Sequence, residues 1–432
     1  MTSDGERAAG TCVISPHRPT CYPSAVNTEF QPSPALAGLL DVLRAAVNGA
    51  VPAAPAEWPA VLAQAHAHGV EAYLYPVVRA WPADRRPDAA QLAAWRLRFL
   101  SAAAEAERGG RQVDDLLARL AEADVPAMPL KGAWLARHVY PEPACRPMAD
   151  IDLLVPRASV EAADGVFRAA GYTGGGAILS ERFIMEHAYR HPEGGRPVEM
   201  HWRFVSDVLP GLPEPDPGEL WRVSAAGGGV WRLPPADHLL LVAHHALHHR
   251  LGLPLRAWLD LVLLARHVAA AGGGALEAAA RRWRLGRAAP AVLDAAAALL
   301  RAPCPPPLDA WTAGADPAGR EQAVALALAW AAEQPPSAGA TLAQFQERRG
   351  WSRLRLAAGR VCMPRDFMRQ HYRCARRAAG LPFAYLRRVW DLAAAHGRDA
   401  CRAFWPETQT ARALRHLAAR GRLVRKWLEE DG

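Results

Sequence analysis

The chain has 432 residues, carries 51 Lys+Arg against 43 Asp+Glu for a net charge of +8, and is 51% hydrophobic. This length exceeds one small domain and allows a large buried core. Since no uninterrupted apolar run approaches the roughly 20 residues that span a bilayer, we expect no membrane span. The first residues carry Asp4, Glu6 and Arg7 without a following apolar core, so we also expect no secretory leader.

Cysteine usage indicates the redox environment. The seven cysteines are odd in number, scattered, and form no Cys-x-x-Cys pair. This pattern favours reduced thiols over a disulfide framework or a zinc knuckle. We therefore expect a soluble, cytoplasmic protein.

The N-terminal part divides into a tail and a helical region. Residues 1–33 are rich in Pro, Thr, Ser and Gly without periodicity, which predicts a mobile tail. Residues 34–122 carry apolar side chains at helical spacing, with proline-rich breaks at 51–59 and 81–87. We expect these helices to pack on the core that follows as structural support. The alternative is that they also shape its pocket.

A possible phosphate-binding turn comes next. The apolar segment from Val125 ends in Lys131-Gly132-Ala133 and is followed by a helix-like stretch, then by a turn-rich segment that contains Arg146. Apart from Lys426, Lys131 is the only lysine in a chain whose other basic residues are all arginines. A lysine before a turn glycine indicates a compact ammonium for nucleotide phosphates, although chance is the alternative.

The segment 148–155 contains Asp150-Ile151-Asp152 within an apolar stretch. In a strand, both carboxylates would project on the same side. They would repel each other unless a cation lay between them, and oxygen ligands with room for water and phosphate suit Mg²⁺. The alternative is a strand edge with two solvated acids.

A third carboxylate follows. After a predicted helix over 159–170, the segments 183–191 and 196–202 read as a hairpin joined through Glu193-Gly194-Gly195. Glu199 lies in the second strand of this hairpin, between apolar neighbours. The predicted order is strand, Lys-Gly turn, helix, Asp-x-Asp strand, helix, and hairpin with a glutamate.

This order resembles the nucleotidyltransferase superfamily of the DNA polymerase β type. More narrowly, LKGAWLARHVYPEPACRPMADIDLLV followed by VEMHW is similar to a bacterial nucleotidyltransferase family typified by Leu-Lys-Gly, Arg-x-x-x-Asp-Ile-Asp-Leu-Leu-Val and Glu-Leu-His-Trp. The resemblance is strong from Pro126 to Trp202 and weaker to Leu264. It implies an α+β fold: a polymerase β-like core with a small mixed sheet, flanked by N- and C-terminal helical regions.

The resemblance also implies an activity. Asp150, Asp152 and Glu199 would be the catalytic residues and would bind Mg²⁺ (or Mn²⁺) at the triphosphate of an NTP. A nucleoside monophosphate would pass to a hydroxyl or similar acceptor on an unknown small molecule or peptide, with release of pyrophosphate. The alternatives are a catalytically degenerate nucleotide-binding or partner-binding subunit of a biosynthetic system, and template-independent RNA tailing.

Nucleotide binding would involve Lys131, Gly132, Ala133 and Arg146. One departure from the family pattern concerns the turn, which reads Gly132-Ala133 in place of Gly-Gly or Gly-Ser. Without a hydroxyl, phosphate would have to be bound by backbone N–H groups at the start of the following helix.

A histidine-rich helix is predicted over 235–249, with i,i+4 pairs His244/His248 and His245/His249. Such pairs can bind a transition metal, but no His-Glu-x-x-His motif or third ligand is evident. We favour helix histidines that line the pocket. In the resembled family this helix and the Trp-Leu-Asp helix follow the core, so the second-rank pocket candidates are His201, His244, His248 and Asp260.

The predicted domains are a tail (1–33), an N-terminal helical region (34–122), the nucleotidyltransferase core (123–205), a helical domain (206–345) and a basic helical C-terminal region (346–432). From Glu347 onward the chain has 20 Lys+Arg against 8 Asp+Glu, including Arg369, Arg373 and Arg376. Such a region can bind polyanions, acidic peptides or a membrane surface, or it is a solvated face, which we favour. No nucleic-acid-binding motif is present, so nucleic acid is not an expected partner.

Overall fold

A computed structural model describes residues 32–176, 178, 184–205, 212–227, 230–333, 351, 358–359, 361–403 and 409–429. The predicted tail lies outside these residues except for Pro32 and Ser33. The predicted α+β class is confirmed: a small mixed sheet is flanked by helices on both sides in the sequence. No helix in the described part of the chain has the length and apolar character needed to cross a membrane.

The region before the sheet is helical, as the periodicity predicted, and its helices are α1 (Pro34–Val47), α2 (Trp58–Ala67), α3 (Glu71–Val78) and α4 (Ala89–Glu122). Helix α1 begins where Ser33 Oγ accepts the Leu36 N–H at 3.3 Å, and α4 begins where Asp88 accepts the Gln91 N–H at 2.8 Å. Both are side-chain caps of free helical N–H groups.

The five-stranded sheet has the order β1-β2-β5-β4-β3. Strands β2 and β5 pair in parallel, whereas all other neighbours pair antiparallel. The strands are β1 (Met128–Pro129), β2 (Ile151–Leu154), β3 (Thr173–Gly174), β4 (Glu186–Arg190) and β5 (Val198–His201). The predicted hairpin is therefore confirmed as β4 and β5. Between the strands lie α5 (Lys131–His138), α6 (Val160–Ala169) and two 3-10 turns, η1 (Pro143–Cys145) and η2 (Arg157–Ser159).

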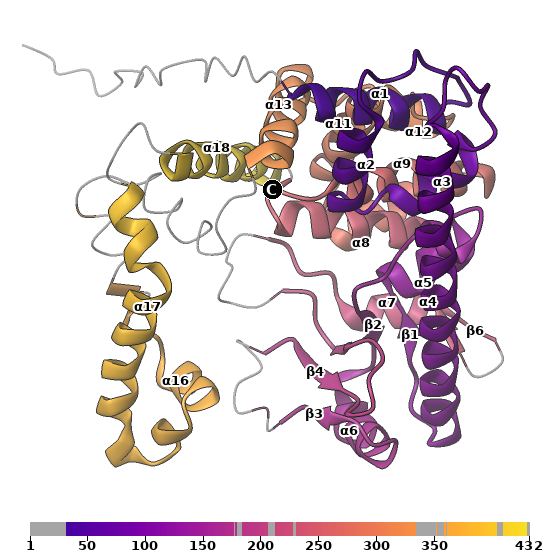
Figure 1. Cartoon of the computed structure of the whole chain (residues 1–432). Helices are drawn as coiled ribbons and strands as arrows, with labels where there is room; N and C mark the ends of the chain where they lie inside the picture. The colour runs from indigo at the N-terminus through magenta and orange to yellow at the C-terminus, as the bar shows by residue number, and fades with distance from the viewer. Residues whose placement is uncertain are drawn as a thin grey trace, which may run out of the picture. The chain divides into compact units, whose positions relative to one another are not determined.

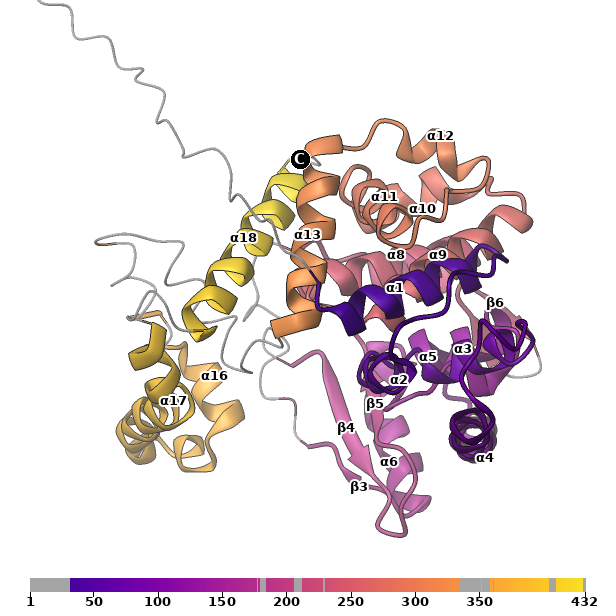
Figure 2. The same cartoon turned by 45° about the horizontal axis from the view of Figure 1, so that its top comes forward.

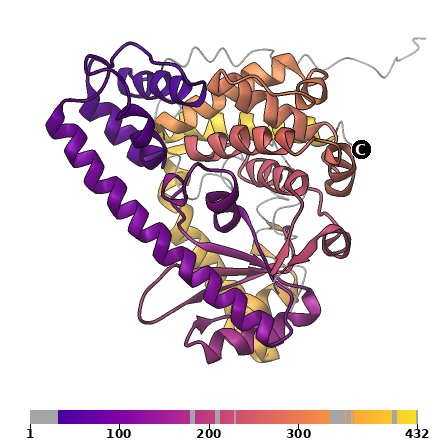
Figure 3. The same ribbon diagram turned by 90° about the vertical axis from the view of Figure 1, so that its right-hand side faces the viewer.

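Side-chain alternation gives the two faces of the sheet different tasks. Ile151 and Leu153 of β2, with Val198 and Met200 of β5, are fully buried in a core formed with α4 and α6. The alternate positions, including Asp152, therefore face the other way. Figure 3 shows the long α4 reaching from the N-terminal helices to the sheet and α6. One face of the sheet is thus a hydrophobic core and the other is free for polar side chains.

The helices after the sheet join those before it in a second, larger core. Helix α11 (Ala288–Leu300) packs against α1, α8 (Pro235–His248) and α9 (Leu255–Ala270), as Figure 2 shows. These helices gather at one end of the sheet, with β3, β4 and α6 toward the other (Figure 1). The helices that follow the sheet, up to Glu333, are α7 (Pro217–Val223), α8 (Pro235–His248), α9 (Leu255–Ala270), α10 (Leu276–Trp283), α11 (Ala288–Leu300), α12 (Leu308–Thr312) and α13 (Pro317–Glu333).

The C-terminal part is helical, as expected. Its helices are α16 (Arg365–His371), α17 (Leu381–Ala403) and α18 (Gln409–Glu429), with the 3-10 turns η3 (Arg373–Arg376) and η4 (Ala378–Gly380). Helix α18 packs on α13, and α16 and α17 share a small core around Phe367 and Met368.

One short strand pair was not predicted. The strands β6 (Ala225–Gly227) and β7 (Val230–Arg232) interrupt a region that the sequence suggested was helical. The Trp231 N–H donates to Ala127 O at 3.1 Å, beside β1. Pairing with a distant backbone stabilises this segment, and such a contact leaves no local periodicity.

The helical core contains a testable buried ion pair. Asp237, fully buried in the first turn of α8, accepts hydrogen bonds from Arg282 at 2.7 and 3.1 Å and from Trp283 Nε1 at 3.1 Å. Asp237→Asn should leave Arg282 without its counter-charge and lower the free energy of unfolding by about 3 kcal/mol, measured by urea denaturation. Glu277→Gln, in an exposed pair with Arg281, should change it by less than about 0.5 kcal/mol. Equal losses in both variants would contradict this account.

Candidate active site

The site is built on the parallel pair β2 and β5. Their register places Asp152 directly beside Glu199, so both side chains point to the face of the sheet opposite α4 and α6. Asp152 is 3% exposed, whereas Glu199 is partly open. Asp150 precedes β2 and borders a cavity that Glu199 also lines. Burial, followed by the charges of Asp152 and Glu199, raises the pKa of Asp150.

His201 joins the acids because it lies two residues after Glu199 on the same face of β5. Its Nε2 is 3.0 Å from Asp152 Oδ1 and 3.7 Å from Glu199 Oε2. Ligand atoms of Asp152, Glu199 and His201 all lie within 4.8 Å of one another. Burial alone would lower the pKa of His201, but hydrogen bonds to Asp152, Glu186 and Glu199 outweigh it and raise the pKa to about 10. Two carboxylates and an imidazole form a donor set that fits a divalent cation.

Lys131 supplies a positive charge from the first turn of α5. Its Nζ donates to Asp152 Oδ1 at 2.7 Å. Burial would lower the pKa of Lys131, but Asp152, with smaller effects of Glu199 and Asp150, raises it, so the ammonium stays charged. Burial alone would raise the pKa of Asp152, but contacts with Lys131 and His201 lower it. Lys131 has a φ of 41°, which is uncommon for a residue with a side chain.

Gly132 is required by what lies beneath it. A β-carbon at position 132 would overlap Arg146 Nη1. Arg146 is held in place, because Asp260 of α9 accepts hydrogen bonds from its Nε at 3.2 Å and its Nη2 at 2.8 Å. Tyr140 donates to the same carboxylate at 2.6 Å. All three side chains are buried, so the helical part of the molecule positions the first turn of α5.

A cavity of about 330 Å³ separates the acids from α8. Its walls differ in charge: the sheet side carries the carboxylates and Lys131, whereas α8 and its C-cap contribute four histidines, His244, His245, His248 and His249. Burial lowers the pKa of His244 to about 3 and of His249 to about 4, so these rings are neutral near pH 7. His244 Nε2 lies 3.0 Å from Pro213 O, and the His245 and His249 rings are 4.4 Å apart.

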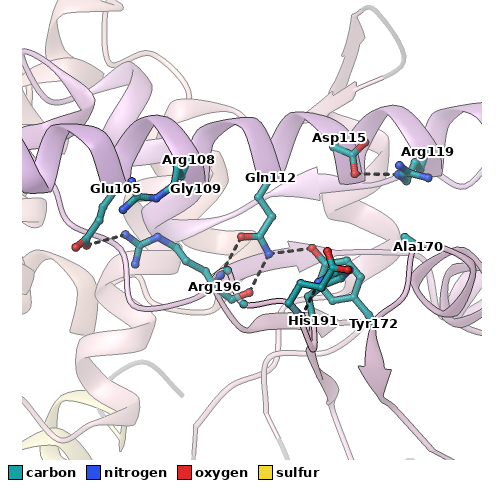
Figure 4. A pocket seen from close by; sticks show the side chains of 13 residues that line it. Glu105, Arg108, Gly109, Gln112, Asp115, Arg119, Ala170, Tyr172, His191 and Arg196 are labelled. Atoms are coloured by element: carbon teal, nitrogen blue, oxygen red, sulfur yellow. Dashed lines mark hydrogen bonds and ion pairs between the residues drawn. The ribbon is translucent and has the colours of Figure 1, made fainter.

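A larger cavity of about 640 Å³ lies elsewhere, between α4 and the β4–β5 turn (Figure 4). Several of its polar groups are paired with one another. Gln112 donates to Tyr172 Oη and to Arg196 O, each at 2.9 Å, and Arg119 pairs with Asp115. This cavity does not contain the group of metal ligands. The smaller cavity is therefore the better candidate for chemistry.

Comparison with known proteins agrees with this geometry. The profile of a family described as uncharacterised nucleotidyltransferase matches residues 54–301, more than half of the chain. The chain belongs to this nucleotidyltransferase family. No curated protein and no solved structure matches it significantly. The matched segment contains all the candidate residues of the site.

The enzyme brings together most of the residues selected from the sequence. Lys131, Asp150, Glu199 and His201 line the cavity, with Asp152 buried behind them. The second-rank candidates His244 and His248 lie on the opposite wall. Gly132 and Ala133 form the first turn of α5. Arg146 and Asp260 do not line this cavity, because they bind each other beneath the turn.

Sequence reasoning missed other cavity residues, above all Glu186, His245, His249 and Phe204. Glu186 pairs in register with His201, and its Oε2 lies 3.0 Å from His201 Nδ1. The predicted hairpin contained the signal for Glu186, because counting back from the turn places an acid opposite the histidine. His245 and His249 belonged to a noted pair, but only the position of α8 shows that they reach the cavity.

The overlap at Gly132 generates a prediction. Gly132→Ala should force Arg146 or the turn to shift, lowering the free energy of unfolding by about 1–3 kcal/mol. Gly165→Ala is the matched control, because Gly165 lies in the exposed interior of α6, where a β-carbon would meet nothing within 4 Å. That change should stabilise the enzyme by about 0.5–1 kcal/mol. Thermal and urea unfolding measure both, and a neutral Gly132→Ala would refute the steric account.

Proposed function

We propose that this enzyme transfers a nucleoside monophosphate from an NTP to a hydroxyl or similar acceptor on a small molecule or peptide, in the manner of polymerase β-type nucleotidyltransferases. The observation that carries the proposal is the register of β2 with β5. In this register Asp152 lies beside Glu199, and Glu199 borders a cavity that Asp150 and Lys131 also line. A family match to nucleotidyltransferases supports the same reaction class.

The chemistry follows from these groups. The acceptor oxygen attacks the α-phosphorus, a new P–O bond forms, and the bond to the β-phosphate oxygen breaks, so pyrophosphate leaves. Glu199, which is partly open and lies beside His201, would take the acceptor proton. A divalent cation such as Mg²⁺ bound at the carboxylates supplies charge neutralisation for the triphosphate and the leaving pyrophosphate.

Phosphate binding falls to α5. Lys131 presents its ammonium at the cavity wall, and the backbone N–H groups of Lys131 and Gly132 in the first turn are donors for phosphate oxygens. This arrangement needs no hydroxyl at position 133. Arg146 contributes by positioning: its bonds to Asp260 fix the surface on which Gly132 rests.

Asp152→Asn tests the proposal. The change keeps the size of the side chain and removes a charge that Lys131 and His201 both contact, so transfer should fall by roughly a hundredfold or more, equivalent to about 3 kcal/mol. The assay follows labelled NTP and pyrophosphate release with candidate acceptors, with and without divalent cation. Glu161→Gln, an exposed acid on α6, is the control and should match the wild type.

Two results would contradict the proposal. One is transfer by Asp152→Asn at the wild-type rate. The other is tight NTP binding without turnover for any acceptor or cation, which would favour a nucleotide-binding subunit instead.

A further inference from the structure

His201 has carboxylate partners at both of its ring nitrogens. On one side, Nδ1 lies 3.0 Å from Oε2 of Glu186, the residue opposite it in the β4–β5 register. On the other side, Nε2 lies 3.0 Å from Asp152 Oδ1 and 3.7 Å from Glu199 Oε2. The ring is 5% exposed. Glu186 thus fixes the imidazole so that Nε2 points between two carboxylates.

This arrangement is typical of metal-binding histidines. A ligating histidine nearly always donates its second ring N–H to a carboxylate or carbonyl, which fixes the ring and raises its basicity. Glu186 occupies that supporting position. The ligand separations also agree: two atoms each about 2.1 Å from one cation lie roughly 3.0–3.5 Å apart at ordinary coordination angles. The observed 3.0 and 3.7 Å are close to this range.

The composition of the group matters for the choice of cation. Mg²⁺ prefers oxygen ligands in a near-octahedral arrangement and retains water. An imidazole nitrogen instead favours borderline transition-metal cations, whose affinity for nitrogen rises from Mn²⁺ toward Co²⁺ and beyond. A site of Asp152, Glu199 and His201 mixes two oxygens with one nitrogen. Asp150 borders the cavity but is not part of this group.

We propose that His201, supported by Glu186, is a nitrogen ligand of the cation site, and that this site therefore binds divalent transition-metal cations in preference to Mg²⁺. The inference rests on the cation site of the proposed function and specifies its third ligand. It assigns Glu186 a positioning task, since its carboxylate contacts His201 and not the other two ligands.

The competing interpretation is that His201 only pairs with the acids as a cation of its own. Both interpretations place the same atoms together, but they differ in what Co²⁺ and Mg²⁺ binding will show. A nitrogen ligand affects Co²⁺ far more than Mg²⁺. A histidine that only neutralises charge affects both cations alike.

The experiment titrates the full-length, nucleotide-free protein with Co²⁺ or Mg²⁺ in separate calorimetric runs and records the visible absorption of bound Co²⁺. We expect wild type to bind Co²⁺ at least about a hundredfold more tightly than Mg²⁺. His201→Asn, which offers an oxygen in place of nitrogen, should lower the Co²⁺ affinity at least about tenfold, change the Mg²⁺ affinity less than about threefold, and alter the Co²⁺ spectrum.

Two further variants keep the test decisive. Glu186→Gln retains all three ligands and should weaken Co²⁺ binding about ten- to a hundredfold, even if His201→Asn folds poorly. His245→Asn changes a cavity histidine of α8 outside the group and should leave the Co²⁺ to Mg²⁺ ratio unchanged. Circular dichroism and thermal unfolding confirm that each variant is folded.

The inference would be overturned if His201→Asn and Glu186→Gln both kept the wild-type ratio of Co²⁺ affinity to Mg²⁺ affinity. If Mg²⁺-dependent transfer persisted in that case, the proposed function would stand without it. If folded wild type bound neither cation, both this inference and the cation site of the proposed function would fail, with nucleotide binding still to be judged by the Asp152→Asn assay.

Discussion

The parallel pairing of β2 with β5 brings two carboxylates together, and the neighbouring side chains of the site compensate for their repulsion. It forces Asp152 and Glu199 onto adjacent positions of one face, with Asp152 almost fully buried. Adjacent carboxylates repel, and a buried charge is costly unless it has close partners of opposite sign. Lys131 reaches Asp152 from α5, and His201 reaches it along β5. Each partner comes from an element next to β2, so the charges are compensated without any flexible loop.

The helical part takes a direct share in this geometry. Asp260 lies on α9, 114 residues after Arg146, and fixes the guanidinium on which the first turn of α5 rests. Because Gly132 has no room for a side chain there, the backbone N–H groups of the first turn are positioned by a contact from a distant helix. Lys131 at positive φ then points its side chain back to Asp152. Disturbing the α9 contact should therefore affect the site as well as the fold, since one buried ion pair serves both.

Local sequence pattern predicted much of this site. The residues that it failed to predict depend on strand register and on pairing between distant segments. Alternation alone placed Asp152 and Glu199 in strands, because a strand fixes which neighbours share a face. The expected turn at 193–195 implies that Glu186 lies opposite His201, but local pattern alone does not show that the two side chains meet, so Glu186 was not recognised as the partner of His201. Arg146 was expected at phosphates, because nothing near it in sequence reveals Asp260. The strands β6 and β7 were missed for a related reason, since their link to β1 is a backbone contact.

The two walls of the cavity have different electrostatic character, and this difference gives the proposed reaction a direction. Among the described residues that line it, Lys131 carries the fixed positive charge on the sheet side, and the carboxylates beside it would hold the divalent cation. The histidines of α8 are kept neutral chiefly by burial, and Lys131 lowers their pKa values further. With that cation bound, a triphosphate would be attracted to the sheet wall and the first turn of α5 and not to α8. The neutral wall is left for a group without strong negative charge, which under the proposed function is the acceptor or the nucleoside.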